Sequence, residues 1–255
     1  MTNRISLAEA AEMVAARRHP RPWNRNYITL SSLLVYLTQT MRAIGLSERS
    51  DLRVLDAGCG TKPYRILFPR VPDKQYFGID IESESRTSEF GPDILADGAK
   101  LPFPDSTFDV GTLLQVLTHV PEPQQFAAEM SRVLKPGGWL ICSGHGMWPV
   151  LGEASVSAAN RWRWTNAGWH AMLTDSGLEV VSIKPADGAA TTFGQLSCLF
   201  ADRIVSDSSS VVRAVKAVGF SAINLGTVLI DRVLNHSGGD FATINYIVVA
   251  RKPIR

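Results

Sequence analysis

The sequence lacks several features that mark whole classes of protein. It has no run of five or more basic residues, and a formal net charge of +2 gives no electrostatic case for binding nucleic acid. Its three cysteines are odd in number and widely separated, which predicts neither a disulfide framework nor a zinc site. Because unpaired cysteines suit a reducing compartment, we expect a cytoplasmic protein. Charged residues interrupt the N-terminal stretch, so no apolar signal segment is expected there.

The segment near the C-terminus also lacks an uncharged stretch long enough to cross a membrane. Between residues 191 and 236 the longest run without a charged side chain is Ala217–Ile230, fourteen residues. A spanning helix needs about 20, so membrane spanning is not expected. The alternatives are a helical hairpin packed on the domain, a homodimer contact, a lid over an apolar substrate, or a helix lying at a membrane surface.

The chain nevertheless has the composition of a globular protein with a sizeable core. It has 255 residues, of which 45% are hydrophobic and 20% charged. Apolar runs alternate with stretches of helical pattern, which predicts a parallel sheet with helices on both faces. The expected strands are Arg53–Asp56, Tyr76–Asp80, Ile94–Ala96, Asp109–Leu114, Trp139–Ser143, Leu178–Ile183 and Phe241–Arg251. The expected helices are residues 6–18, Asn26–Ile44, Pro63–Phe68, Glu122–Leu134, Thr165–Asp175, Gly194–Val205 and Val211–Leu234.

These elements divide the chain into four parts. We expect an N-terminal helical cap over residues 1–48 and a core over 49–190. A helical insert over 191–238 would then precede the last strand of the core, in 239–255.

Two apolar runs that each end on an acid are the most informative feature of the sequence. Val54–Thr61 carries Asp56 and a turn with two glycines, and Asp80 ends the second run, twenty positions after Gly60. Glycines allow a tight turn and a close backbone approach to a ligand, and an acid at the end of the second strand can accept from ribose hydroxyls. The rival reading is a nicotinamide dinucleotide site, but that fingerprint needs a third glycine where this chain has Pro63.

Val54–Thr61 resembles the first motif of the class I S-adenosylmethionine-dependent methyltransferases, although Lys62 follows where the family often has glycine. Two further stretches, 93–110 and 134–141, resemble later blocks of the same family in the same order. The subgroup resembled is the small-molecule type of ubiquinone and menaquinone biosynthesis. The resemblance implies a doubly wound, seven-stranded Rossmann-like α/β sheet with S-adenosylmethionine as cofactor. It also implies methyl transfer to a small, possibly apolar or natural-product acceptor. The alternative is a protein that binds this cofactor as a non-methylating partner or regulatory subunit.

The resemblance places most of the cofactor contacts at the ends of the predicted strands. Asp56 would contact the cofactor's ammonium or only hold the glycine turn, and Asp97 would accept from the adenine amino group or only shape a turn. Ile81 would pack on the adenine, and Gln115 would meet the methionine end. Cys59 is expected to be a small filler. The expected cofactor-binding residues are Asp56, Gly58, Cys59, Gly60, Asp80, Ile81, Asp97, Gly98, Ala99 and Gln115, and no metal site is expected.

Catalytic residues are harder to predict, because a sulfonium donor is already activated and mainly has to be held in line with its acceptor. A general base helps only where the acceptor must lose a proton. His119 and His145 are the candidates, with capping of the next helix as the alternative for His119 and substrate contact for His145.

Aromatic and basic residues suggest where the acceptor binds. The run Arg161–Trp164 lies where the family often has an aromatic–Arg–aromatic pattern at the acceptor pocket, and plain packing is the alternative. Trp23, Tyr27 and Tyr36 of the predicted cap are candidates for covering the active site, with core packing favoured for Tyr36.

Overall fold

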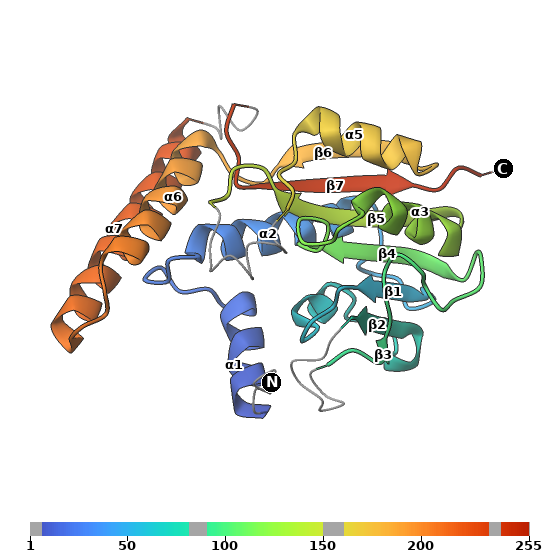
Figure 1. Ribbon diagram of the computed structural model, residues 1–255, viewed down its shortest axis with the longest axis horizontal. Coiled ribbons are helices and arrows are strands. Elements are labelled where there is room, and N and C mark those ends of the chain that lie inside the picture. Colours follow the sequence, from blue (N-terminus) through green and yellow to red (C-terminus); the bar gives the residue numbers. More distant parts are fainter. Residues whose placement is uncertain (1–6, 82–90, 150–160, 235–240, 255) are drawn as a thin grey trace.

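The computed structural model describes residues 7–81, 91–149, 161–234 and 241–254, and it shows a seven-stranded sheet flanked by helices (Figure 1). The strands are β1 (Val54–Ala57), β2 (Tyr76–Asp80), β3 (Ile94–Leu95), β4 (Phe108–Leu114), β5 (Leu134–His145), β6 (Glu179–Pro185) and β7 (Asn245–Arg251). The helices are α1 (Leu7–Arg18), α2 (Tyr27–Ala43), α3 (Pro123–Val133), α5 (Asn166–Asp175), α6 (Ala189–Ile204) and α7 (Ser210–Val233). Two short 3-10 turns are η1 (Pro63–Leu67) and η2 (Asp73–Gln75).

The strands lie in the order β3-β2-β1-β4-β5-β7-β6. Neighbouring strands from β3 to β5 are parallel, whereas β7 runs antiparallel to both of its neighbours, β5 and β6. The predicted doubly wound α/β fold is therefore confirmed. Because the parallel strands end at one edge of the sheet, the loops that follow them gather there.

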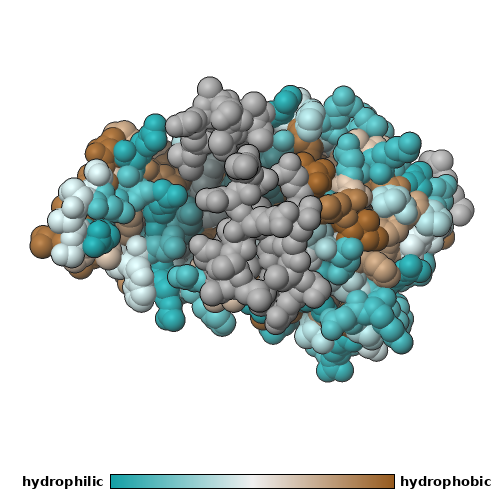
Figure 2. All heavy atoms as spheres, turned by 60° about the horizontal axis from the view of Figure 1, so that its bottom comes forward, coloured by the Kyte–Doolittle hydropathy of each residue, from teal (hydrophilic) through white to brown (hydrophobic). Residues whose placement is uncertain are grey.

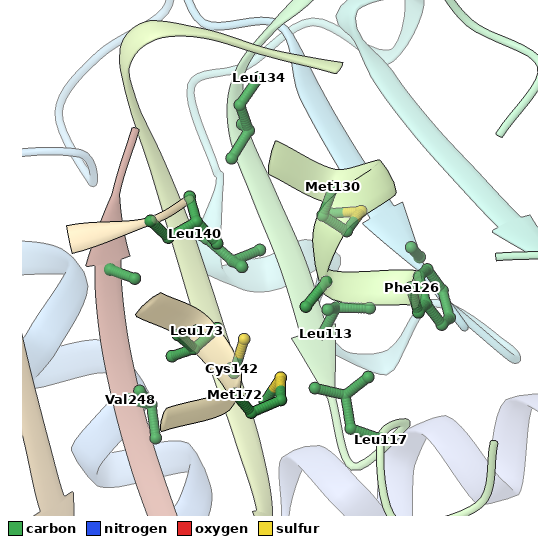
Figure 3. Close-up of a cluster of buried hydrophobic side chains, with 14 of the residues drawn as sticks. Leu113, Leu117, Phe126, Met130, Leu134, Leu140, Cys142, Met172, Leu173 and Val248 are labelled. Carbon is green, nitrogen blue, oxygen red and sulfur yellow. The ribbon is translucent and has the colours of Figure 1, made fainter. Parts of the chain in front are cut away.

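Alternating residues of β5 show why both faces of the sheet are covered. Leu140 and Cys142 point into a core with α3 and α5, where Leu113 and Met130 also lie (Figure 3). Ile141, between them in sequence, points to the other face and packs in a cluster with α2 and η1. Side chains alternate across a strand, so a strand that is apolar throughout requires helices on both sides.

Strands β5 and β7 differ in length from the prediction. β5 extends five residues before and two residues after the predicted Trp139–Ser143. β7 begins at Asn245, four residues after the predicted start at Phe241, because its ladder with β5 starts where Asn245 pairs with His145.

The first helix between β6 and β7 begins earlier than predicted, at Ala189 and not at Gly194. Asp231, far along α7, accepts hydrogen bonds from the backbone N–H groups of Ala190 at 3.0 Å and Thr191 at 2.9 Å. This distant carboxylate satisfies the free donors of the first helical turn, so the helix can begin there without a local capping residue. The first six residues of the expected cap and residues 235–238 of the expected insert lie outside the described ranges.

Buried amides tie the α6–α7 hairpin to the N-terminal helices. The side chain of Gln195 accepts from the backbone N–H of Thr29 at 3.1 Å. Asn224 donates to the carbonyls of Pro22 at 2.7 Å and Asn24 at 3.1 Å, in the loop before α2. Both amide residues are fully buried, so losing these bonds would leave polar groups unsatisfied in the interior.

Asp187, at the end of β6, is a buried carboxyl beside the same region. Ser32 donates to one of its oxygens at 2.5 Å, and the backbone N–H of Asn245 donates to the other at 3.1 Å. Burial raises the pKa of Asp187 to about 7. Its ionisation in the folded protein is therefore unfavourable, despite the two hydrogen bonds.

We expect Asp187→Asn to remove a pH dependence of stability. The folded pKa lies above the unfolded value near 4, so the favourable contribution of the protonated carboxyl is lost as pH rises from about 4 to above 7. Urea denaturation should show the variant more stable than the wild type at pH 8, by roughly 4 kcal/mol for a pKa shift of about three units, and nearly equal to it at pH 4. Asp175→Asn, at an exposed position of α5, is the control. If the variant and the wild type differ in stability by the same amount at pH 4 and at pH 8, the prediction is contradicted.

Candidate functional site

Two adjoining cavities of about 500 and 560 Å³ open at the carboxyl edge of the sheet, beyond β1, β2 and β4. They share the residues Gly58, Asp80, Gln115, Val116 and His119. Each of the twelve residues predicted for cofactor binding or catalysis lines at least one of these cavities. Residues at the ends of five strands, β1 to β5, therefore meet in one cleft.

The turn after β1 takes its shape from two glycines with left-handed backbone. Gly58 has φ +73°, and a Cβ there would lie 2.3 Å from a methyl group of Val116. Gly60 has φ +50° and open space beside it. The backbone N–H groups of Gly58 and Cys59 donate to the carbonyl of Ile79, at 2.8 and 3.0 Å, which fixes the turn against the end of β2.

Asp80 lies directly across from this turn. One carboxylate oxygen accepts from the backbone N–H of Gly60 at 2.9 Å, and the other accepts from that of Ile81 at 2.8 Å. Each oxygen keeps a further lone pair, and the side chain lines both cavities. This geometry suits a pair of ligand hydroxyls at the junction of the two cavities.

The second cavity has an apolar slot beyond Asp80. Ile81 lies at its rim and is 68% exposed, and Phe126 lies opposite. The ring of Phe126 fills the space where a Cβ on Gly98 would be, 2.1 Å away. Asp97 is exposed and accepts from the backbone N–H of Ala99 at 2.9 Å. Asp97 thus shapes a turn while its carboxylate remains at the cavity wall.

Asp56 lies under the glycine turn and is buried. It accepts hydrogen bonds from the hydroxyl groups of Tyr76, at 2.5 Å, and Thr112, at 2.7 Å. Burial raises its pKa against the opposing effect of these two bonds. The carboxylate thus connects β1 with β2 and β4, which supports the reading that Asp56 holds the turn.

Cys59 lines the first cavity, but it is buried and its sulfur lies against Gly78 of β2, so the thiol is not activated. Burial, followed by the charges of Asp56 and Asp80, raises its pKa well above its usual value. The group therefore stays protonated near neutral pH and is a poor nucleophile. Among the residues that the structure describes, no group of three or more histidine, cysteine, aspartate or glutamate side chains is placed to hold a metal ion.

Gln115 adopts a conformation that is rare for a residue with a side chain, with φ +65°. Its backbone N–H donates to the carbonyl of Ser143 at 3.0 Å, and its side-chain nitrogen donates to Asn245 Oδ1 at 3.1 Å. Its side-chain oxygen is buried with no partner among the described residues. Strain and an unpaired buried acceptor at a cavity wall are typical of a ligand site.

His145 also depends on Asn245. Its Nδ1 lies 2.9 Å from Asn245 Oδ1, and its ring stacks on Trp148 with centroids 4.4 Å apart. Burial lowers the pKa of His145 to about 4, so the imidazole is neutral at pH 7. Because its partner atom is an amide oxygen, Nδ1 carries the proton, and Nε2 is left as an acceptor. His119 is exposed at the junction of the two cavities.

The run Arg161–Trp164 does not line either cavity, contrary to the expected role at the acceptor pocket. The guanidinium of Arg163 donates to the carbonyls of Trp148 at 2.8 Å and Pro149 at 3.2 Å. Trp164 is buried against Trp169, with centroids 4.9 Å apart. Arg163 and Trp164 thus have packing roles, whereas Arg161 and Trp162 are exposed.

The N-terminal helices do border the first cavity, but through other residues than those predicted. Neither cavity is lined by Trp23, Tyr27 or Tyr36. The lining residues from this part of the chain are Arg17, Asn26, Thr29, Leu30 and Leu33.

Three residues that line or support the cleft could not be predicted from the sequence. Arg17 is the only lysine or arginine that lines a cavity in the described part of the chain, and it hydrogen bonds with Tyr64. Trp148 and Asn245 come from positions that no local pattern marks. Asn245 lies 130 residues from Gln115 along the chain, so only the completed sheet brings the two together.

Comparisons with known proteins find similarity to methyltransferases. Residues 55–142 match a family model described as a methyltransferase domain. The chain is 33% identical to an uncharacterized methyltransferase of Schizosaccharomyces pombe over 158 residues, 55% of this chain and 52% of that protein. It is 30% identical to the 27-O-demethylrifamycin SV methyltransferase of Amycolatopsis mediterranei over 133 residues, 48% of each. The chain thus spans about half the length of the curated relatives it matches.

Solved structures share the fold at low sequence identity. The [4+2]-cyclase SpnF has a TM-score of 0.55 and 20% identity, over 86% of this chain and 81% of that one. Phosphoethanolamine N-methyltransferase 2 of Haemonchus contortus, solved with S-adenosyl-L-methionine, has a TM-score of 0.54 and 14% identity, over 86% of this chain and 52% of that one. At these identities the likeness extends to the fold alone.

The two glycines of the turn give a matched test of its geometry. We expect Gly58→Ala to lower the free energy of unfolding by roughly 2–3 kcal/mol, because strained backbone and a clash with Val116 add together. Gly60→Ala meets the backbone strain without the clash and should cost about 1 kcal/mol. Urea denaturation of both variants measures the difference. Equal losses would show that Val116 moves aside freely.

Asp80→Ala should weaken binding of S-adenosylhomocysteine by 30- to 150-fold. Loss of the hydrogen bonds from two ligand hydroxyls to a carboxylate costs roughly 2–3 kcal/mol. Isothermal calorimetry measures the affinity, and Asp175→Ala, exposed on α5, is the control. An unchanged dissociation constant for Asp80→Ala would place this carboxylate outside the ligand site.

Proposed function

We propose that this protein transfers the methyl group of S-adenosylmethionine to a small-molecule acceptor, and the match of residues 55–142 to a methyltransferase domain supports the proposal. The observation that carries the proposal is the joined cleft at the carboxyl edge of the sheet. Asp80 lines both cavities, the glycine turn and His145 line the first, and Ile81 and Phe126 line the second.

The two ends of the cofactor would occupy different parts of the cleft. The apolar slot between Ile81 and Phe126 suits a planar base, and Asp80 suits the ribose. The first cavity suits the amino-acid end, since Asp56 and the unpaired oxygen of Gln115 can meet an ammonium group. The guanidinium of Arg17, in the same cavity, suits a carboxylate.

The acceptor would enter the part of the first cavity between α2 and the end of β5. Leu30 and Leu33 give this part an apolar wall, Asn26 and Thr29 add polar groups, and Trp148 offers an aromatic face. A cavity of about 500 Å³ falls in the range of small-molecule sites. Relatives named for a rifamycin and for demethylmenaquinone support an acceptor with a largely apolar ring system.

The chain's own residues supply orientation and a place for a proton. Nε2 of the neutral His145 can take the proton of an acceptor hydroxyl or amine while the acceptor atom bonds to the methyl carbon, the carbon–sulfur bond of the sulfonium breaks, and S-adenosylhomocysteine leaves. Asn245 accepts from Nδ1–H and fixes the ring orientation. Because burial disfavours the imidazolium, His145 would hold that proton only briefly before passing it to water.

A second candidate function is cofactor binding without methylation, as a partner or regulatory subunit. The observation in its favour is that a [4+2]-cyclase shares this fold, so the architecture alone does not determine methyl transfer. Incubation with S-adenosylmethionine labelled in the methyl group, together with small-molecule extract fractions, separates the two. Label recovered in an extracted compound supports methyl transfer. Tight binding of S-adenosylhomocysteine without any transfer supports the alternative, and an NADH isotherm alone would contradict both.

A cytoplasmic location is also a proposal. It is supported by Cys59, Cys142 and Cys198, which are all buried and unpaired, as is usual in a reducing compartment.

His145→Ala should lower the turnover number about 100-fold or more if the acceptor loses a proton. Binding of S-adenosylhomocysteine should change by less than threefold, because Gln115 and Asp80 remain in place. The wild-type rate should rise with pH through about 4 and then stay level, as the imidazole of His145 loses its proton there. His170→Ala, exposed on α5, is the control. An equal rate for both variants would exclude His145 as the base.

A further inference from the structure

The outward face of α7 is apolar and has no partner within the described chain. Figure 1 places α7 at one end of the molecule, beside α6 and away from the sheet, and Figure 2 shows hydrophobic atoms at this end. Side chains exposed by 50% to 72% form the face. The large ones are Val211, Val215, Val218, Leu225, Leu229 and Val233. An exposed apolar face of this length marks an interaction surface.

The spacing along this face is that of a helix that pairs with another helix. From Val211 to Leu229 the exposed apolar positions follow one another at intervals of four, three, four, three and four residues. This is the spacing of a coiled-coil seam. The order of the intervals is the same from either end, and its midpoint lies between Val218 and Ala222. A face of this kind is complementary to an antiparallel copy of itself.

The centre of the face is lined with small residues. Gly219, Ala222 and Gly226 are exposed, and both glycines have open space where a Cβ would be. Glycine inside a helix costs about 1 kcal/mol relative to alanine, so two of them need compensation. A second helix can approach closely over small residues and place its own side chains between the larger ones. A lipid surface gains nothing from such hollows.

Ionic and polar contacts hold α7 firmly on the body. Lys216 lies 2.7 Å from Asp202 and 2.8 Å from Asp207. Near the other end, Asp231 caps α6. The 24 residues of α7 are long and apolar enough to cross a membrane, but these contacts keep the helix beside α6. The apolar face of α7 is therefore a rigid surface that is already folded before any partner binds. Such a surface suits a protein partner.

The six large side chains of this face are 50% to 72% exposed, so pairing with the same face of a second copy removes a continuous apolar stripe of both copies from water. We propose that two copies of this chain form a dimer in which α7 pairs with α7 of the second copy, antiparallel about a twofold axis midway between Val218 and Ala222. Val215 of one copy then lies opposite Leu225 of the other.

Sedimentation velocity over a range of concentrations tests the dimer. The wild type should sediment at twice the monomer mass of 27.9 kDa. Val218→Asp and Leu225→Asp should each raise the dimer dissociation constant at least 100-fold, because each buries a charge at the seam. Both side chains are exposed in the single chain, so folding and S-adenosylhomocysteine affinity should be unchanged. Val181→Asp, 53% exposed on β6, is the matched control and should remain dimeric.

Cysteine crosslinking tests the direction of pairing. Val218 of one copy lies opposite Ala222 of the other, so an equimolar mixture of Val218→Cys and Ala222→Cys should give a disulfide-linked dimer on mild oxidation. Val211→Cys alone should not, because the two Val211 positions lie about 27 Å apart in the antiparallel pair. The native thiols are buried and do not compete. Crosslinking through Val211→Cys, a monomer at all concentrations, or a monomer that cosediments with neutral phosphatidylcholine vesicles would each overturn the proposal.

Discussion

A buried carboxylate at the end of β1 is the constraint on which the site depends. Asp56, on β1, accepts hydrogen bonds from Tyr76 on β2 and Thr112 on β4. One side chain therefore links the ends of three neighbouring parallel strands. The glycine turn begins two residues later and can only then reach the carbonyl of Ile79. Such a group is costly to bury, and the two hydroxyl donors compensate for part of that cost. The hydrogen bonds of Asp56 therefore set the position of the glycine turn. Because Gly60 of that turn donates to Asp80, they also influence where Asp80 lies.

The last strand supplies the second fixed point. Asn245 begins β7 and accepts from Gln115, which follows β4, and from His145, which ends β5. A single amide oxygen thereby positions one residue that lines both cavities and one that lines the first. The hairpin of α6 and α7 acts at longer range, because its buried amides Gln195 and Asn224 bind the first turn of α2 and the segment that leads into it. The first cavity is thus bordered by elements that are far apart in the sequence.

Much of the sheet could be predicted from the sequence, because its signals are local. Apolar runs that end on an acid marked β1 and β2, and the glycines at 58 and 60 marked the turn between them. The twelve predicted site residues line the two cavities for the same reason, since strand ends must gather at one edge. Their individual roles remain predictions.

The rest depends on contacts that no local pattern encodes. α6 begins early because Asp231 caps it from another helix, and Arg163 turns away from the cleft to bind two carbonyls. Arg17 lines the first cavity, and the amide of Asn245 contacts His145. Both placements follow from how the completed fold packs.

The place of β7 in the sheet has a consequence for how the chain folds during synthesis. β7 leaves the ribosome after every other described strand, yet it lies between β5 and β6. Until it emerges, β5 and β6 present unpaired edges, and such edges attract other chains. The helical segment between β6 and β7 lengthens that interval, since its residues must be made first. A ribosome that stalls within α7 would therefore hold a nascent chain with an open sheet and no Asn245 to complete the cleft.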